Sequence, residues 1–407
     1  MEQLDPEVVA WVLAHGRAAV TDAAARLDQG DEPLAIATSL RRTLTGDRSA
    51  FVLSAATARL RAVAAGVDGA SQLILTREAQ EQASHPSVVR WRAARAGEAL
   101  AHVRASAARP LQDRCAGTGG DAVGMATHAA VLAVEQDPGR ALLARDRASV
   151  LGVDVEVVVG DALDPALSSR GAIVHADPDR RDATGRRARS LAQHRPSVAD
   201  LRAATGDAAG RLLTVAPGVD WADPDIAPDA EVCFLQVDRT LVEAVLCDGA
   251  AAEPGTRARA VLLPEGLERT RADTILQLPV GPVGSHLLVP AVAATRARIH
   301  DAIGAEHGAR RIARHRALLT SDAAIDSPWL GCEPVLAVLP GRAKALRAWL
   351  RDNPDHRVEV LLHGLDLNLR AFLRDAGRPA TGPDDLRVHA IRRDDDAVLV
   401  VCGPIPQ

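Results

Sequence analysis

The chain has 407 residues, of which 47% are hydrophobic and 2% aromatic, and its formal net charge is −5. This length predicts two or three domains, and the negative charge excludes a generally basic nucleic-acid binder while leaving local basic patches possible. Five cysteines without C-x-x-C spacing predict no metal site, and because no run of about twenty apolar residues occurs, we expect a soluble cytoplasmic protein without a membrane partner.

Residues 1–72 are predicted to form an N-terminal helical domain. Apolar residues recur at helical spacing, for example at Val9 and Val12. Pro6 directly follows Asp5, and proline is common at the first position of a helix. We therefore expect a small helical cap in front of the next domain.

Residues 73–250 are predicted to form a doubly wound α/β core whose central feature is a glycine-rich turn. Asp113 ends a short strand and is followed by Gly117, Gly119 and Gly120 at the start of a helix. A carboxylate beside such a turn would repel a phosphate but attract a cationic or zwitterionic ligand. The same glycines also satisfy the loose dinucleotide fingerprint, so the turn alone leaves both kinds of cofactor open.

Further predicted strands of this core also end in polar or turn residues. The valine-rich stretch 153–159 is typical of a largely buried strand. In open α/β folds ligands bind at the carboxyl ends of the strands, so we expect a site along this edge. The strands and the residues that follow them are 129–134 with Glu135 and Gln136, 153–159 with Asp161 and Ala162, 171–176 with Asp177 and Pro178, and 211–215 with a turn at 216–218.

The rest of the chain is predicted to be strands and helices of a different arrangement. Two strands, 231–237 and 241–247, should close the core as an antiparallel pair. A Pro/Gly-rich connecting segment, 251–325, includes a predicted helix at 291–303. In residues 326–407, predicted strands at 335–339, 358–362 and 398–401 alternate with predicted helices at 343–350 and 367–376, which indicates a small α+β domain.

Two arginine-rich segments suggest contacts with a phosphate-bearing substrate. From Asp179 to Arg202 seven arginines face three aspartates, directly after a strand end, which favours substrate contact. From Thr295 to Arg316 six arginines face two acids, and here local pairing on a solvated face is at least as good an interpretation. Trp221 could stack on a base, although a lone tryptophan more often packs in a core.

The order of these motifs resembles that of the class I S-adenosylmethionine (SAM)-dependent methyltransferases. Within that class the chain is most similar to the branch with a C-terminal THUMP-like domain, which is distantly related to the trimethylguanosine synthases. The resemblance covers roughly residues 73–407. It implies SAM as the cofactor, RNA (rRNA or tRNA) methylated at a base nitrogen as the substrate, and a THUMP-like domain at residues 326–407.

The resemblance also implies roles for individual residues. Asp113 is expected near the methionine amino group, Glu135 on the ribose and Asp161 near the adenine. Asp177 would orient the methyl acceptor, and Pro178 would hold its turn. The remaining implied contacts are Cys115, Gly117, Gly119, Gly120, Asp121, Gln136 and Ala162 for the cofactor, and Arg180, Arg181 and Trp221 for the substrate.

Three features depart from the pattern of this family. Arg114 stands in the first strand where related sequences usually carry leucine, and damage to that strand would weaken SAM binding. Asp179 replaces the aromatic residue that follows the aspartate–proline pair in many N-methyltransferases, which argues against a capped-guanosine substrate. Residues 362–366 lack the basic turn expected in the last domain. Three other functions stay open: an NAD(P)-dependent oxidoreductase, a non-catalytic RNA-binding protein with a decayed methyltransferase core, and a small-molecule methyltransferase.

Overall fold

The computed structural model describes residues 4–103, 109–180, 190–272, 274–354, 356–377, 386–394 and 396–403. The chain forms two compact units. The first comprises Met1–Asp238, Val242–Arg257 and Leu262–Leu267, and the second comprises Arg239–Leu241, Ala258–Val261 and Glu268–Gln407. Among the described residues, no helix combines the length and the apolar character needed to cross a membrane.

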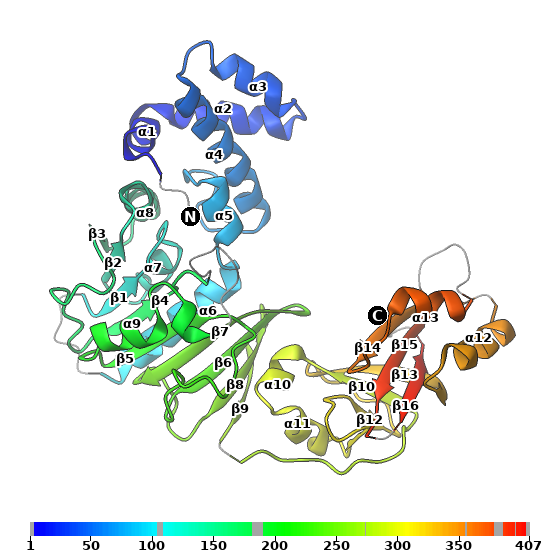
Figure 1. The fold of residues 1–407 in the computed structure, drawn as a ribbon. Coiled ribbons are helices and arrows are strands. Elements are labelled where there is room, and N and C mark those ends of the chain that lie inside the picture. Colours follow the sequence, from blue (N-terminus) through cyan, green and yellow to red (C-terminus); the bar gives the residue numbers. More distant parts are fainter. Residues whose placement is uncertain are drawn as a thin grey trace. The chain divides into compact units, whose positions relative to one another are not determined.

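Helices occupy the first part of the chain (Figure 1). Asp5 caps the first of them, because its side chain accepts hydrogen bonds from the backbone N–H groups of Glu7 and Val8. Buried residues of these helices form one apolar cluster with Leu143 of α8 (Pro138–Leu151), so the helices share a core with the sheet-bearing part of this unit. The helices are α1 (Pro6–Trp11), a π-helical turn (Val12–Gly16), α2 (Arg17–Asp28), α3 (Pro33–Leu40) and α4 (Gly46–Ala64).

The first unit contains a mixed β-sheet in which seven strands follow the order β3-β2-β1-β4-β5-β7-β6. The pairs among β1 to β5 are parallel, and β7 pairs antiparallel with β5. The predicted α/β core is therefore confirmed, together with the two predicted strands that extend it, although the sheet order continues beyond β6. The strands are β1 (Leu111–Arg114), β2 (Val131–Glu135), β3 (Val155–Val159), β4 (Ile173–Ala176), β5 (Gly210–Val215), β6 (Glu231–Val237) and β7 (Thr240–Gly249).

Helices line both sides of this sheet. In Figure 1, α9 passes in front of the strands and α6 passes behind them. The chain leaves the sheet at β3 on one edge and re-enters at β4 on the other side of β1, so the strand order reverses between β1 and β4. Such a reversal opens a crevice at the carboxyl ends of the two strands. The helices are α5 (Arg77–Gln82), α6 (Pro86–Ala101), α7 (Gly120–Met125), α8, a 3-10 turn (Leu191–Gln193) and α9 (Val198–Ala204).

The prediction that residues 153–159 form a largely buried strand is wrong. Val157 is buried in β3, whereas Glu156 is exposed and Val159 is 43% exposed. The reason is position, because β3 pairs with β2 and ends the sheet. Glu156 contacts Arg109 at 2.7 Å at this edge.

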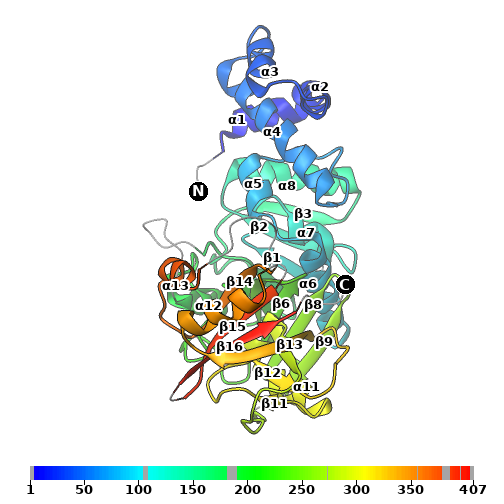
Figure 2. The ribbon, with the colours of Figure 1, turned by 90° about the vertical axis from the view of Figure 1, so that its right-hand side faces the viewer.

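The second unit carries a sheet of its own, with the strand order β11-β12-β10-β13-β16-β15-β14. Two helices, α12 (Ala343–Asp352) and α13 (Leu369–Asp375), pack on it through Leu346, Leu350 and Phe372 (Figure 2). The strands are β10 (His286–Pro290), β11 (Arg310–Arg311), β12 (Leu319–Ser321), β13 (Leu330–Pro340), β14 (Val358–His363), β15 (Leu386–Arg392) and β16 (Ala397–Cys402), and β8 (Ala258–Leu263) and β9 (Leu267–Arg271) precede them in the chain.

The alternation of strands and helices predicted for residues 326–407 is present, with β15 as an additional strand. The single helix predicted at residues 291–303 is instead two helices, α10 (Val292–Arg296) and α11 (His300–Glu306). They are separated at Arg298, whose φ of 58° is incompatible with a continuing right-handed helix.

Candidate functional site

A cavity of about 1730 Å³ lies at the carboxyl ends of β1 to β4 in the first unit. It is bounded by the turn after β1, by the segments that follow β2, β3 and β4, and by the start of α6. Gly119 and Trp221 are not among its lining residues, and Arg181 lies outside the described residues. The other predicted site residues line it together: Asp113, Cys115, Gly117, Gly120, Asp121, Glu135, Gln136, Asp161, Ala162, Asp177, Pro178 and Arg180.

The turn after β1 needs left-handed backbone at three positions. The φ angles are 72° at Cys115, 56° at Gly117 and 77° at Gly119. A Cβ on Gly119 would lie 3.2 Å from the Cα of Ala144 in α8, whereas a Cβ on Gly117 would meet nothing within 4 Å. Gly119 therefore allows the turn to pack on α8, and Gly117 keeps space open at the cavity wall. Burial raises the pKa of the Cys115 thiol far above its usual range, which disfavours a nucleophilic thiolate.

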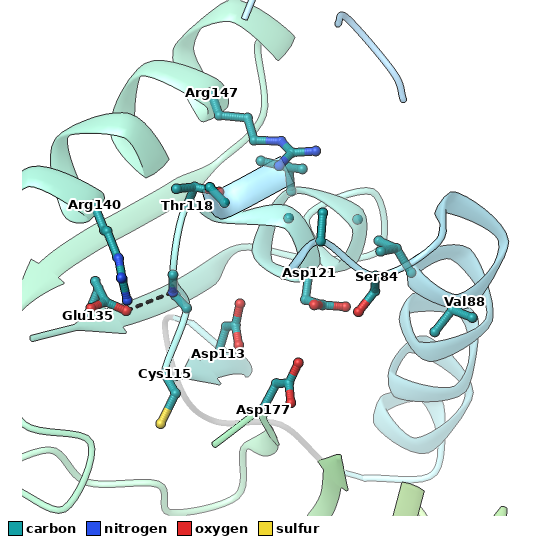
Figure 3. Close-up of a pocket in the computed structure, with 18 of the residues that line it drawn as sticks. Ser84, Val88, Asp113, Cys115, Thr118, Asp121, Glu135, Arg140, Arg147 and Asp177 are labelled. Carbon is teal, nitrogen blue, oxygen red and sulfur yellow. Dashed lines mark hydrogen bonds between the residues drawn. The ribbon is translucent and has the colours of Figure 1, made fainter. Parts of the chain in front are cut away.

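Glu135, at the end of β2, is held by backbone N–H groups. Its Oε2 accepts from the Gly117 N–H at 2.7 Å, drawn as a dashed line in Figure 3, and its Oε1 accepts from the Asp137 N–H at 2.9 Å. Burial raises the pKa of Glu135, although both N–H groups oppose this shift. Each oxygen keeps a further lone pair, so the carboxylate can also accept from hydroxyl groups of a ligand.

Asp113, in β1, presents an unsatisfied oxygen at the cavity wall. Its Oδ1 lies 2.9 Å from His175 Nδ1, and His175 Nε2 lies 3.3 Å from Thr214 Oγ1. Its Oδ2 is buried without a hydrogen-bond partner among the described residues. Burial raises the pKa of Asp113, whereas the pKa of His175 rises against the effect of burial because Asp121 and Asp113 are near. A bound cation would satisfy the unpaired oxygen.

Arg92 of α6 is the centre of a buried ionic network. Its guanidinium lies 2.8 Å from Asp121 Oδ1, 2.9 Å from Glu243 Oε1 and 3.1 Å from Thr214 Oγ1. Burial raises the pKa of Glu243 to about 7, although Arg92 opposes this rise. Burial disfavours the charge of Arg92 as well, yet Asp121 and Glu243 outweigh that effect and raise its pKa.

The acidic side chains at this side of the cavity favour a cationic ligand. Figure 3 shows the carboxylates of Asp113, Asp121 and Asp177 directed toward one space between the glycine turn and α6. Glu243 adds a fourth acid to the same cavity wall. Arg92 contacts Asp121 and Glu243, and His175 contacts Asp113, so two basic side chains pair with three of these four acids. A ligand with positive charge would be attracted to this arrangement.

The loop between β3 and β4 forms the next part of the wall. Asp161 is exposed, and its Oδ1 accepts from the Leu163 N–H at 2.9 Å. The carbonyl of Ala162 accepts from the guanidinium of Arg114 at 2.9 Å. β1 nevertheless pairs in register with β2 and β4 along its whole length. Arg114 thus leaves the first strand undamaged, contrary to the expected effect of this departure.

Asp177 and Pro178 follow β4, which neighbours β1 on the side away from β2. Asp179 and Arg195 then form a backbone bridge, with an N–O distance of 3.0 Å in each direction, so the chain returns to the site at Arg195. Arg180 and Arg195 both line the cavity. Four arginines of this segment lie outside the described residues: Arg181, Arg186, Arg187 and Arg189.

Trp221 and one arginine of the second arginine-rich segment have local partners. Trp221 packs against Phe234 of β6, with ring centroids 5.6 Å apart. In the second arginine-rich segment, Arg310 pairs with Asp322 at 2.9 Å. These contacts support the packing interpretation for the tryptophan and the local pairing interpretation for that segment.

A separate buried cluster lies in the second unit. Glu333, His389 and Cys402 each offer an atom that could bind a metal ion, within 4.8 Å of one another. His389 Nε2 lies 2.9 Å from Glu333 Oε2, and Arg387 donates to Glu333 Oε1 at 2.8 Å. These contacts give the Glu333 carboxylate two partners within the protein.

The sequence did not indicate the network residues Arg92, His175 and Glu243 as members of the site. One signal was available, because His175 and Glu243 interrupt otherwise apolar strands. A charged or titratable residue in a buried strand requires a buried partner, and such residues cluster at functional sites.

Curated proteins provide one set of relatives. The chain is 29% identical over 348 residues to an uncharacterized S-adenosylmethionine-dependent methyltransferase of Mycobacterium tuberculosis, found in strains H37Rv and CDC 1551. The aligned region covers 82% of this chain and 90% of that protein. No family model matches the chain.

Solved structures provide a second comparison. A crystal structure from Porphyromonas gingivalis W83, of a protein provisionally named a methyltransferase, matches 100% of both chains with a TM-score of 0.75 and 16% identity, which shows the fold alone. The tRNA (uracil-54, C5)-methyltransferase of Pyrococcus abyssi, solved with S-adenosyl-L-homocysteine (SAH), matches 40% of this chain and 38% of that chain with 17% identity. Its TM-score of 0.27 is too low to support an argument.

Proposed function

We propose that this chain, a SAM-dependent methyltransferase of class I, methylates RNA, in rRNA or tRNA, at a base nitrogen. The observation that supports this most is the ordered set of acids at successive strand ends around one cavity. Asp113 and Glu135 belong to β1 and β2, and Asp161 and Asp177 follow β3 and β4. The expected order of SAM contacts along such a sheet matches this order of residues.

The described residues fit SAM as the cofactor. Asp113 has a buried oxygen without a partner, and a cationic amino group would supply the missing donor. Glu135 would accept from the ribose hydroxyls, and Asp161 would accept from the adenine amino group. When bound, SAM supplies a methyl group that its positively charged sulfur activates for transfer.

Asp177 is the residue that we propose to orient the methyl acceptor. Asp177 and Pro178 follow β4 and line the cavity, and Pro178 would hold the turn there. In-line transfer to a nitrogen depends mainly on the position of that atom, so a carboxylate that accepts from its N–H contributes through alignment. Cys115, Gly117, Gly120, Asp121, Gln136 and Ala162 would complete the cofactor wall.

The size and charge of the cavity support RNA as the substrate. A volume of about 1730 Å³ exceeds the range of about 300–1,000 Å³ typical of small-ligand pockets, so it has room for an acceptor beside the cofactor. Arginine side chains favour phosphate groups of a nucleic acid. The arginines that line the cavity are Arg90, Arg140, Arg147, Arg180 and Arg195.

A small-molecule acceptor is the second candidate. None of the described residues that line the cavity is phenylalanine or tryptophan. RNA bases that are unstacked for modification are usually held on aromatic rings. An acceptor other than a nucleobase would not need such a ring.

Cofactor and substrate can be tested separately. Purified protein should show a thermal shift with SAM or SAH and none with NADH, and the reverse result would overturn the cofactor assignment. Labelled methyl groups should then enter RNA from a strain that lacks this gene, but not with the Asp177→Ala variant. Label that enters a metabolite extract while RNA stays inert would select the second candidate. SAM and RNA binding without any incorporation would indicate a decayed core.

A further inference from the structure

We propose that Arg114 is a positioning residue for the adenine-binding wall of the cavity, because its buried guanidinium holds the β3–β4 loop in the shape that presents Asp161 and Ala162. This inference rests on the proposed function, in which that loop contacts the adenine of the cofactor. From the sequence alone, Arg114 was expected to damage the first strand and to weaken SAM binding; in this inference it supports the binding wall.

The contacts of Arg114 all lead to this loop or to a residue that supports it. Its side chain is fully buried. The guanidinium donates to the carbonyls of Ala162 at 2.9 Å and Leu167 at 2.7 Å, and to Ser169 Oγ at 3.0 Å. It also donates to Gln112 Oε1, at 3.1 Å from Nε. Nη1 and Nη2 thus bond to acceptors near the start, in the middle and near the end of the loop, whereas Nε bonds only to Gln112.

Gln112 extends the same support. Residues i and i+2 of a strand point to the same face, so Gln112 and Arg114 leave β1 on one side. The Nε2 of Gln112 donates to the Ser168 carbonyl at 2.8 Å, and its Oε1 accepts from Ser169 Oγ at 3.2 Å. The two side chains of β1 therefore bind four groups of the loop, namely three carbonyls (Ala162, Leu167 and Ser168) and the Ser169 hydroxyl. This loop contains no helix or strand between residues 160 and 172.

The loop depends on these donors because it lacks repetitive backbone pairing. Buried carbonyls without a donor destabilise the conformation that buries them. A leucine at position 114 would leave the carbonyls of Ala162 and Leu167 without this donor. A lysine would provide charge but not the planar fork that reaches several acceptors at once. Arg114 therefore fixes Ala162 directly, and with it the adjacent Asp161.

The test uses SAH and S-inosylhomocysteine, which lacks the adenine amino group, as probes in calorimetry. Arg114→Met should weaken SAH binding about tenfold and bring the Kd values for the two probes closer together. Hydrogen exchange in residues 160–170 should become faster. Arg109→Met is the matched control, because Arg109 precedes the same strand but contacts Asp154 and Glu156. It should leave both Kd values unchanged.

Milder variants keep the inference testable if Arg114→Met does not fold. Arg114→Lys should reduce the ratio of the Kd values for S-inosylhomocysteine and SAH. Ser169→Ala should reduce the same ratio to a smaller extent and should make hydrogen exchange in the loop faster. Unchanged Kd values and unchanged loop exchange in a folded variant would overturn the inference. Failure of the wild-type protein to bind SAH would instead overturn the proposed function on which the inference rests.

Discussion

Arg92→Met should destabilise the first unit through loss of charge compensation. Methionine keeps an apolar stem but removes the guanidinium that contacts Asp121, Glu243 and Thr214. Removing one partner of a buried ion pair costs about 3–5 kcal/mol, because the other charge stays buried without compensation. Two carboxylates lose their partner here, so we expect a loss in the upper part of that range.

The size of this loss should depend on pH in a defined direction. Burial raises the pKa of Glu243 to about 7 from an ordinary value of 4.5, so the folded state favours the protonated acid. The stability that a raised pKa contributes is present at low pH and is lost as the pH rises through the folded-state pKa. Without Arg92 this pKa rises further, and deprotonation becomes more costly. The variant should therefore lose more stability at pH 8 than at pH 6, relative to wild type.

Urea denaturation at both pH values, followed by circular dichroism, measures this difference. Arg109→Met is again a suitable control, because Arg109 contacts two acids at 2.7 Å near the surface. Exposed pairs of this kind contribute about 0–1 kcal/mol. The reasoning is refuted if Arg92→Met loses no more stability than the control, or if its loss is equal at pH 6 and pH 8.

Three further predictions concern the same cavity. Asp177→Asn should slow methyl transfer about 100-fold in single-turnover assays through misalignment of the acceptor, and a parallel loss of SAH affinity would contradict its acceptor role. Gly119→Ala should lower the free energy of unfolding by about 1–3 kcal/mol, and Gly117→Ala by less, because only the former places a Cβ against Ala144; equal losses in urea denaturation would argue against this contact. SAM binding at pH 7 should release protons, because a cation lowers the raised pKa of Glu243. Calorimetry in buffers of different ionisation enthalpy measures this release. It should disappear in the Glu243→Gln variant, and a release that persists there would show that the protons come from another group.

The strands of the first unit could be predicted because polar or turn residues punctuate the apolar runs. β6 covers the predicted residues 231–237, and the other predicted strand ends of this sheet lie within two residues of those observed. β15 was missed because Arg387 and His389 interrupt its apolar pattern. The side chains of both contact Glu333, a tertiary partner that local sequence does not reveal. The division at residues 72, 250 and 325 and the THUMP-like character of the last part stay predictions.

That the predicted residues would meet at one cavity could be foreseen for the same reason, but the buried network beside it could not. Asp113 meets His175 because β1 and β4 pair in parallel with these two residues opposite each other. Arg92 meets Glu243 across 151 residues of sequence. Strand order and register decide both contacts, and neither is specified by the pattern of a single strand.

Arg92 and Arg114 are among the largest fully buried side chains of the described residues, and each contacts residues that line the cavity. Arg92 compensates carboxylates beside the glycine turn, and Arg114 satisfies carbonyls of the loop that follows β3. A buried cation is tolerated only where its partners are fixed around it. Lys344 is the only lysine among the 48 lysine and arginine residues, so the preference for arginine extends over the whole chain. At these two positions the bias has a structural use, because only the planar guanidinium can serve several separate acceptors from one buried point.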